Sequence, residues 1–248
     1  MTAFKDHFSD QSDIYAKYRP SYPKELFEYL ASVSKQHNKV WDCGTGNGQA
    51  AIALAEYFKT VIATDPSVSQ IKNAQPGNNI TYHTWPAEKT DIDESSVDLI
   101  TVAQAIHWFD FKAFYKEVKR VATKEAFLAV WTYSLIQIDP VIDKVISKLY
   151  SDILGNYWPK ERRYVDEAYK TIPFPFIEIA TPSLQIKKIW SKQDLLQYLM
   201  TWSSTQRYVK KHEQNPIAFI IDELNTYWND KDEKQVYWDL HIRTGKIH

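Results

Sequence analysis

Asp42 and three closely spaced glycines are the residues of this 248-residue chain best suited to hold a ligand. They lie within residues 40–48, whose sequence is VWDCGTGNG. The apolar start of this stretch predicts a strand, and its glycines predict a tight turn into a helix. Because glycine has no Cβ, the backbone can bend sharply here and a ligand can approach main-chain atoms. The stretch therefore predicts a nucleotide-type loop for a dinucleotide, a phosphate or another adenosine compound.

The spacing of the glycines argues against a dinucleotide. The dinucleotide fingerprint needs glycines at relative positions one, three and six, but here they stand at 44, 46 and 48, and position 49 is Gln49. Asp42 would repel phosphates, yet it could contact an ammonium group directly or through water. Asp65 closes the next predicted strand, where a carboxylate can accept both hydroxyls of a ribose. These residues favour an adenosine compound that lacks a pyrophosphate.

His107 is the candidate proton acceptor, since it follows an apolar predicted strand, and the unperturbed pKa of histidine is about 6.5. A structural histidine packed in the loop before Asp110 is the alternative. The other histidines show no metal-ligand spacing, so we expect no metal. Cys43 is the only cysteine, which excludes an internal disulfide and fits a reducing compartment.

An alternation of strands and helices must position these residues. Apolar runs predict strands at 39–43, 60–64, 79–84, 97–103 and 126–131, with helices near 23–36, after the glycine turn, at 67–74 and from Asp110 onward. This rhythm predicts a doubly wound α/β fold with a mostly parallel sheet.

The pattern changes after about residue 134. Asp139-Pro140 predicts the start of a long helix, followed by a second helix near 158–171, extended segments over 176–190, a capping box at Ser191 and Asp194, and a further helix from Asn215. Alternation near 236–243 predicts an antiparallel strand close to a sheet edge. We expect one domain over 1–248, made of a flap and helix (8–36), a ligand-binding core (37–134), a lid and acceptor-side insertion (135–232) and a C-terminal strand (233–248).

The composition limits the class of partner. Thirty basic and 31 acidic side chains give a net charge of −1, which offers no electrostatic reason to bind nucleic acid or an anionic membrane. No signal peptide or membrane span is recognisable, so we expect a cytoplasmic monomer or homodimer with a small-molecule partner. The 9 Trp and 16 Tyr indicate either an aromatic-lined pocket or simply a compositional habit.

The combined motifs resemble those of the class I S-adenosylmethionine-dependent methyltransferases. The resemblance is carried by the glycine loop, Asp65-Pro66-Ser67, Ala87-Glu88 and residues 103–110, AQAIHWFD, and it covers about 8–134. Tyr15, Arg19 and Tyr22 lie in a segment similar to that of a small-molecule branch that includes the trans-aconitate methyltransferases. The resemblance implies a Rossmann-like, mostly parallel seven-stranded sheet with an antiparallel strand near the C-terminus and helical insertions.

The resemblance also implies a role for each matched residue. Gly44, Thr45, Gly46, Asn47 and Gly48 would wrap the methionine part, with Asp42 near its amino group. Asp65 would bind the ribose, Pro66, Ser67, Ala87 and Glu88 would meet the adenine, and Ala103 and Gln104 would lie beneath the sulfonium. Tyr15 and Arg19 would close over the cofactor, and Tyr22, Trp108, Trp202, Arg207 and Tyr208 would contact the acceptor.

The implied activity is methyl transfer from S-adenosylmethionine to a small molecule, for which a carboxylic acid is one candidate, with release of S-adenosylhomocysteine. If the acceptor is a carboxylate, no deprotonation is needed and His107 would only orient it. Two alternatives stay open at this point: a non-catalytic S-adenosylmethionine-binding protein, because binding and turnover are separate demands, and a nucleotide-dependent oxidoreductase.

Overall fold

The computed structural model describes residues 18–248, so the predicted role of Tyr15 falls outside the described residues. One mixed sheet organises this part of the chain, with strand order β3-β2-β1-β4-β5-β8-β6 and with β7 also paired to β8. The strands are β1 (Lys39–Cys43), β2 (Thr60–Thr64), β3 (Ile80–His83), β4 (Val97–Ala103), β5 (Ala122–Tyr133), β6 (Ile177–Ile179), β7 (Leu184–Ser191) and β8 (Glu233–Lys246).

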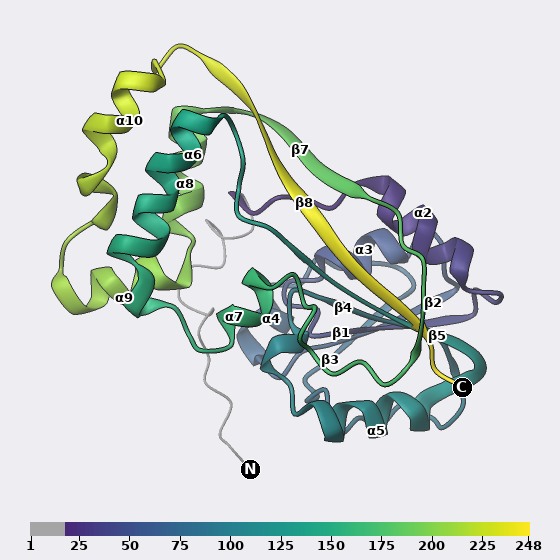
Figure 1. The fold of residues 1–248 in the computed structure, drawn as a ribbon. Coiled ribbons are helices and arrows are strands. Elements are labelled where there is room, and N and C mark those ends of the chain that lie inside the picture. The colour runs from purple at the N-terminus through teal and green to yellow at the C-terminus, as the bar shows by residue number, and fades with distance from the viewer. Residues whose placement is uncertain (1–17) are drawn as a thin grey trace.

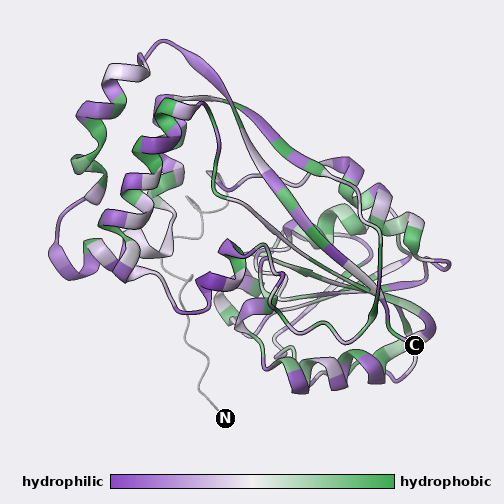
Figure 2. Cartoon of the chain, viewed as in Figure 1, coloured by the Kyte–Doolittle hydropathy of each residue, from purple (hydrophilic) through white to green (hydrophobic). Residues whose placement is uncertain are grey.

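The sheet is seven positions wide although it contains eight described strands. β6 pairs with the end of β8 and β7 with its beginning, both on the side opposite β5. They therefore share one edge. The first five strands are parallel and β8 is antiparallel to β5, as the sequence predicted. β8 lies one position inside the edge, and Figure 2 shows the alternation of hydrophilic and hydrophobic residues that identified it.

Helices cover both faces of the sheet and one of its ends. The α-helices are α2 (Lys24–Val33), α3 (Gln49–Leu54), α4 (Val68–Lys72), α5 (Phe111–Val121), α6 (Pro140–Ser147), α7 (Arg162–Asp166), α8 (Lys192–Met200), α9 (Ser203–His212) and α10 (Ile221–Tyr227). Shorter turns are η2 (Ile106–Trp108), the π-helical η3 (Lys148–Ile153), η4 (Gly155–Tyr157) and η5 (Pro216–Phe219). Figure 1 shows α6, α8, α9 and α10 gathered at one end of the molecule, where the long strands β7 and β8 reach them. We call these four helices the helical cap.

Side-chain alternation along the central strands builds two cores. Val40 and Leu99 face the core that contains α2 and α3, whereas Trp41 and Ile100 face the core that contains α5. The first core continues into the helical cap. Because β1 and β4 contribute to both cores, their carboxyl ends are held firmly from two sides.

Several predicted caps are present. Asp110 accepts a hydrogen bond from the Ala113 amide at 3.0 Å, and Asp139 accepts from the Val141 and Ile142 amides at 3.1 and 3.0 Å. Ser191 and Asp194 form the predicted capping box.

The helix predicted over 158–171 was wrong in extent, because α7 covers only Arg162–Asp166. Ala168 and Tyr169 adopt left-handed backbone angles, with φ of 54° and 60°, which end the helix. The resulting turn directs the Tyr169 side chain into the second core.

Candidate functional site

The glycine loop joins the end of β1 to α3 and is held against β2. Gly44, Gly46 and Gly48 have φ angles of 69°, 57° and 84°, a region that side chains with a Cβ rarely adopt. The amides of Gly44 and Thr45 both donate to the Thr64 carbonyl, at 2.8 and 2.9 Å. The loop is therefore anchored to the carboxyl end of the neighbouring strand.

The three glycines differ in what lies beside them. A Cβ at position 44 would clash with Ala105, which follows β4, and a Cβ at position 48 would clash with Tyr82 of β3. At Gly46 the nearest atom would be Oε1 of Gln70, 3.8 Å away. The backbone at Gly46 is thus the part of the loop that a ligand can approach.

Asp42 supports this loop from beneath. Its carboxylate is fully buried and accepts hydrogen bonds from the Thr45 hydroxyl at 2.5 Å and the Thr101 hydroxyl at 2.9 Å. Burial raises the pKa of Asp42 to about 6, against the lowering effect of the two hydroxyls. The structure therefore gives Asp42 a loop-fixing role, and its contact with an ammonium group stays a prediction.

Asp65 links the glycine loop to α4. One carboxylate oxygen accepts from the Gly46 amide at 3.0 Å and the other from the Ser67 amide at 2.9 Å. Ser67 in turn is the N-cap of α4 and accepts from the Gln70 amide at 3.3 Å, with Pro66 between the two. A carboxylate can accept up to about four hydrogen bonds, so these backbone contacts are compatible with a ribose contact.

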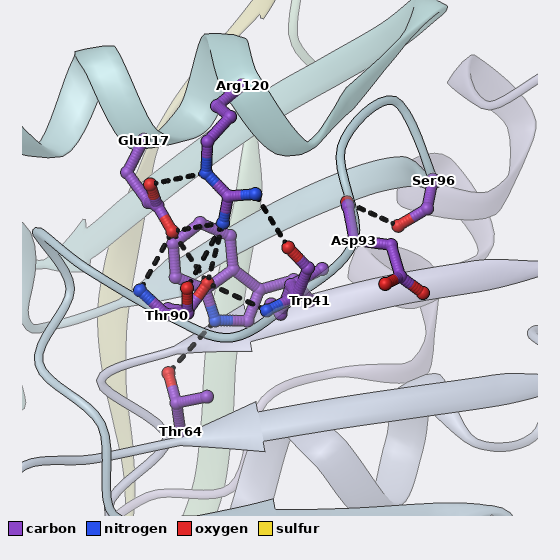
Figure 3. Close-up of polar contacts among 8 residues, drawn as sticks. Trp41, Thr64, Thr90, Asp93, Ser96, Glu117 and Arg120 are labelled. Carbon is purple, nitrogen blue, oxygen red and sulfur yellow. Dashed lines mark hydrogen bonds and ion pairs between the residues drawn. The ribbon is translucent and has the colours of Figure 1, made fainter.

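Ala87 and Glu88 lie in the loop between β3 and β4, where Ala87 is buried and Glu88 accepts from the Asp110 amide at 3.0 Å. A polar network holds the rest of this loop to α5 (Figure 3). In it, Glu117 accepts from the amide and the hydroxyl of Thr90 at 2.8 and 2.7 Å, and from Arg120. Arg120 also donates to the Ile92 carbonyl at 2.7 Å.

Charge pairing outweighs burial at Glu117. Burial alone would raise the pKa of this carboxyl, but the hydrogen bonds from Arg120 and Thr90 hold it below its usual range. The network is therefore ionised at neutral pH, and it fixes the loop that carries Ala87 and Glu88.

Ala103 and Gln104 occupy the carboxyl end of β4. Gln104 has φ of 55°, its amide donates to the Trp131 carbonyl at 2.9 Å, and its Oε1 accepts from the Thr132 hydroxyl at 2.7 Å. The chain thus turns sharply away from the sheet here, immediately beside the end of β5.

His107 lies in η2 and is buried. Its Nδ1 shares a hydrogen bond of 2.7 Å with the hydroxyl of Tyr169. Burial lowers the pKa of His107 to about 3, and the positive charge of Arg162 adds to that effect. The imidazole is consequently neutral at physiological pH and is a much weaker base than a solvent-exposed histidine.

The predicted acceptor-side residues do not all lie together. Trp108 is 36% exposed and lies beside His107, with 4.9 Å between the ring centroids. Tyr22 packs edge-on against Trp131 of β5 at 5.5 Å. These two residues lie near the carboxyl ends of β4 and β5, and their contact with an acceptor stays a prediction.

Arg19 connects β5 to the end of α8. It donates to the Tyr133 hydroxyl at 2.9 Å and to the Thr201 carbonyl at 3.3 Å, and its guanidinium lies 5.8 Å from the Tyr198 ring centroid. Its pairing with a cofactor carboxylate stays a prediction.

Trp202, which follows Thr201 between α8 and α9, is only 3% exposed. Its ring packs against other aromatic rings of the first core, so the structure places Trp202 in packing rather than on an open binding surface.

Arg207 and Tyr208 lie on α9 and contact the cap itself. Arg207 donates to the Tyr157 carbonyl at 3.1 Å, and the Tyr208 ring lies 5.0 Å from that of Tyr157. Both contacts are made with Tyr157 of η4, and neither joins Arg207 or Tyr208 to His107.

Two proteins described as methyltransferases are similar to nearly the whole chain. A protein of Dictyostelium discoideum classed as a methyltransferase is 36% identical over 245 residues, which is 97% of this chain and 93% of that protein. A structure classed as a type II methyltransferase, from Anaeromyxobacter dehalogenans, is 40% identical with a TM-score of 0.87, and the match covers 92% of this chain and 98% of that one. The methyltransferase domain family matches residues 41–130. The chain belongs to the class I S-adenosylmethionine-dependent methyltransferases.

A further relative supports the cofactor. A Saccharomyces cerevisiae protein described as an S-adenosylmethionine-dependent methyltransferase is 31% identical over 132 residues, 50% of this chain and 45% of that protein. As a member of the family, this chain is an enzyme that uses S-adenosylmethionine, and the two alternatives left open by the sequence are set aside. The backbone accessible at Gly46 and the Asp65 carboxylate suit a nucleoside that brings no phosphates.

Several residues that shape the candidate site gave no signal in the sequence. Tyr169 and Arg162 come from the predicted lid, and Glu117 and Arg120 from the outer helix α5. Spacing of three on α5 predicts that Glu117 and Arg120 are neighbours, but nothing in it shows that they bond the preceding loop.

Within residues 18–248, no group of three or more His, Cys, Asp and Glu side chains is arranged to hold a metal ion. In the same part of the chain, no helix has both the length and the apolar character that crossing a bilayer requires.

Proposed function

We propose that this methyltransferase transfers the methyl group of S-adenosylmethionine to an oxygen of a small carboxylic acid. In this proposal the enzyme belongs to the branch that includes the trans-aconitate methyltransferases. In this proposal residues 44–48 wrap the methionine part of the cofactor, Asp65 binds the ribose, and Ala87 and Glu88 meet the adenine. Pro66 and Ser67 border the adenine, and Ala103 and Gln104 lie beneath the sulfonium.

The hydrogen bonding and the pKa of His107 are the observations from which we infer the class of acceptor. Its Nδ1 is engaged by Tyr169, and the pKa of the ring, lowered to about 3 by burial, makes it a poor proton acceptor. Phenols, amines and thiols lose a proton when they are methylated, whereas a carboxylate is already ionised at neutral pH. An acceptor that needs no base fits this site best, and His107 then orients groups around it.

The bound cofactor supplies a methyl group on a sulfonium: a carboxylate oxygen forms the new carbon–oxygen bond, the carbon–sulfur bond breaks with its electron pair going to sulfur, and no proton moves. The protein's contribution is to align and dehydrate the acceptor, and holding two reactants in place supplies on the order of 7 kcal/mol or more of barrier reduction.

The test is transfer of labelled methyl from S-adenosylmethionine to matched panels of carboxylic acids, phenols, amines and thiols. Products are then treated with alkali, because methyl esters release labelled methanol whereas ethers, methylamines and thioethers do not. We expect base-labile label from the acids. Base-stable label from another class would reject the carboxylic acid.

A further inference from the structure

Arg162, the first residue of α7, makes an incomplete set of contacts. Its Nε donates to the Tyr150 hydroxyl at 2.8 Å and to Oδ1 of Asp166 at 3.1 Å. Its guanidinium carbon lies 4.7 Å from the ring centroid of Trp158 and 5.4 Å from that of Tyr150. Within residues 18–248 its two terminal nitrogens have no hydrogen-bond acceptor, and the side chain keeps 23% exposure. The guanidinium is therefore held by one nitrogen and two rings, while its other donors reach accessible space.

The position of α7 shows where those donors lie. α7 packs against η2, the turn after β4 that carries His107. The charge of Arg162 acts on two groups at this end of the sheet. It adds to the burial that lowers the pKa of His107, and it opposes the burial that raises the pKa of Tyr169. Arg162 thus lies on the β4 and β5 side of the site.

The residues proposed for the nucleoside lie on the other side. The glycine loop, Asp65 and Glu88 follow β1, β2 and β3, which are consecutive in the sheet on the far side of β4. A cofactor held by these residues has its nucleoside over β1 to β3. The acceptor must then approach from β4 and β5, where Arg162 stands.

The surroundings of Arg162 suit a carboxylate. Asp166, its ion-pair partner, is 47% exposed and meets only Nε, so water weakens that pairing. A guanidinium offers a planar pair of donors that matches the two oxygens of a carboxylate, and charged hydrogen bonds of this kind are about twice as strong as neutral ones. Stacking on Trp158 fixes the plane of the donors before a ligand arrives, which reduces the entropy lost on binding.

We propose that the terminal nitrogens of Arg162 bind a carboxylate of the acceptor substrate. The inference rests on the proposed function in taking the acceptor to be a small carboxylic acid, and it adds the residue that selects for the acid. Arg162 is a specificity residue in this assignment: it contacts the acceptor, not the cofactor.

The experiment is calorimetric titration of the complex with S-adenosylhomocysteine, using benzoate, phenylacetate, succinate and citrate as probes and the uncharged amide of each as its control. The variants are Arg162→Gln, which removes the charge, and Arg162→Lys, which keeps the charge but not the planar fork. Arg163→Gln is the matched control, because Arg163 is exposed and its guanidinium contacts only Tyr164 among the described residues.

We expect at least one acid to bind the wild-type complex and its amide to bind far more weakly. Affinity for that acid should fall about tenfold or more in Arg162→Gln and less in Arg162→Lys, since a bidentate charged contact is lost or reduced. Arg163→Gln should bind it normally. S-adenosylhomocysteine affinity should stay within about twofold throughout, because substitutions at residues that share no partners have nearly independent effects. If Arg162→Gln does not fold, the affinities of Arg162→Lys and Arg163→Gln for the acid still show whether Arg162 binds it.

Three results would overturn the assignment: no probe acid binds the wild-type complex, acid and amide bind equally, or the Arg162 variants bind the acid as tightly as wild type. Failure of the proposed function has a different signature. If acids bind through Arg162 but receive no base-labile methyl group, Arg162 still anchors a carboxylate and the methylated atom lies elsewhere on the acceptor. If acids are methylated equally by wild type and Arg162→Gln, the function stands and the anchor does not.

Discussion

At the scale of single residues, Asp65 is the proposed ribose ligand, and it touches both the glycine loop and the start of α4. Asp65→Ala should weaken binding of S-adenosylhomocysteine by about 1–3 kcal/mol, the cost of losing charged hydrogen bonds. Calorimetric titration measures this. Asp91→Ala, which removes an exposed carboxylate from the β3–β4 loop, is the control. An unchanged affinity in folded Asp65→Ala would reject the ribose role.

The raised pKa of Asp42 should make the stability of the folded protein depend on pH. Its pKa is raised by burial to about 6, above the value of about 3.9 of an unfolded aspartate. The folded protein therefore holds a proton that the unfolded chain releases, so this contribution to stability is complete below about pH 4 and is lost as the pH rises through about 6.

Asp42→Asn isolates that effect because asparagine stays neutral and can still bond the two threonine hydroxyls. The unfolding free energy of wild type minus that of Asp42→Asn should fall by about 2 kcal/mol between pH 4.5 and 7. Urea titrations of the unliganded proteins across this range measure it. A difference that does not change with pH would contradict the protonated, buried state of Asp42.

At the scale of elements, α5 acts as a support for the loop between β3 and β4. Glu117 and Arg120 bond Thr90 of that loop (Figure 3), and Arg120 also bonds Ile92. The Arg120 carbonyl accepts from the Ser95 amide at 2.9 Å. Since Ala87 and Glu88 lie in the same loop, the ordering of this proposed adenine contact depends on a helix outside the site.

Glu117→Gln should therefore affect both stability and cofactor binding. We expect a loss of about 1–3 kcal/mol in unfolding free energy, because the Arg120 charge loses its buried partner. Adenosine and S-adenosylhomocysteine should both bind more weakly. Glu125→Gln, which breaks exposed pairs with Lys35 and Lys246, is the control and should change the unfolding free energy far less, because water screens exposed pairs. Lower stability with normal adenosine affinity would limit the network to a structural role.

At the scale of the whole molecule, the first hydrophobic core joins the sheet to the helical cap. Trp238 of β8 is fully buried and donates to the Tyr198 hydroxyl of α8 at 3.2 Å, and Arg19 bonds both Tyr133 of β5 and the carbonyl after α8. We propose that the chain forms one domain, in which the cap and the sheet unfold together.

Urea unfolding followed by far-ultraviolet circular dichroism and by tryptophan fluorescence should accordingly give coincident single transitions. The far-ultraviolet signal reports the whole chain. Tryptophan fluorescence combines rings of the sheet, such as Trp41 and Trp131, with rings at the junction of the cap with β7 and β8, such as Trp190 and Trp238. Two separated midpoints would show that the cap unfolds independently, and Trp238→Ala, by removing the junction, should shift both signals together.

The sequence by itself determined the strands of the sheet, the glycine loop with its following carboxylate, and the caps at Asp110, Asp139 and Ser191. These features depend on backbone geometry and side-chain periodicity over a few neighbouring residues. They can therefore be predicted from local sequence, as the loop from Asp42 to Gly48 was, without knowing what surrounds them. The tertiary structure decided the pairing of His107 with Tyr169, the burial of Trp202 and the position of Arg162. Each of these depends on contacts between segments tens of residues apart, and burial by such contacts is what converts His107 from a candidate base into a neutral, fixed ring.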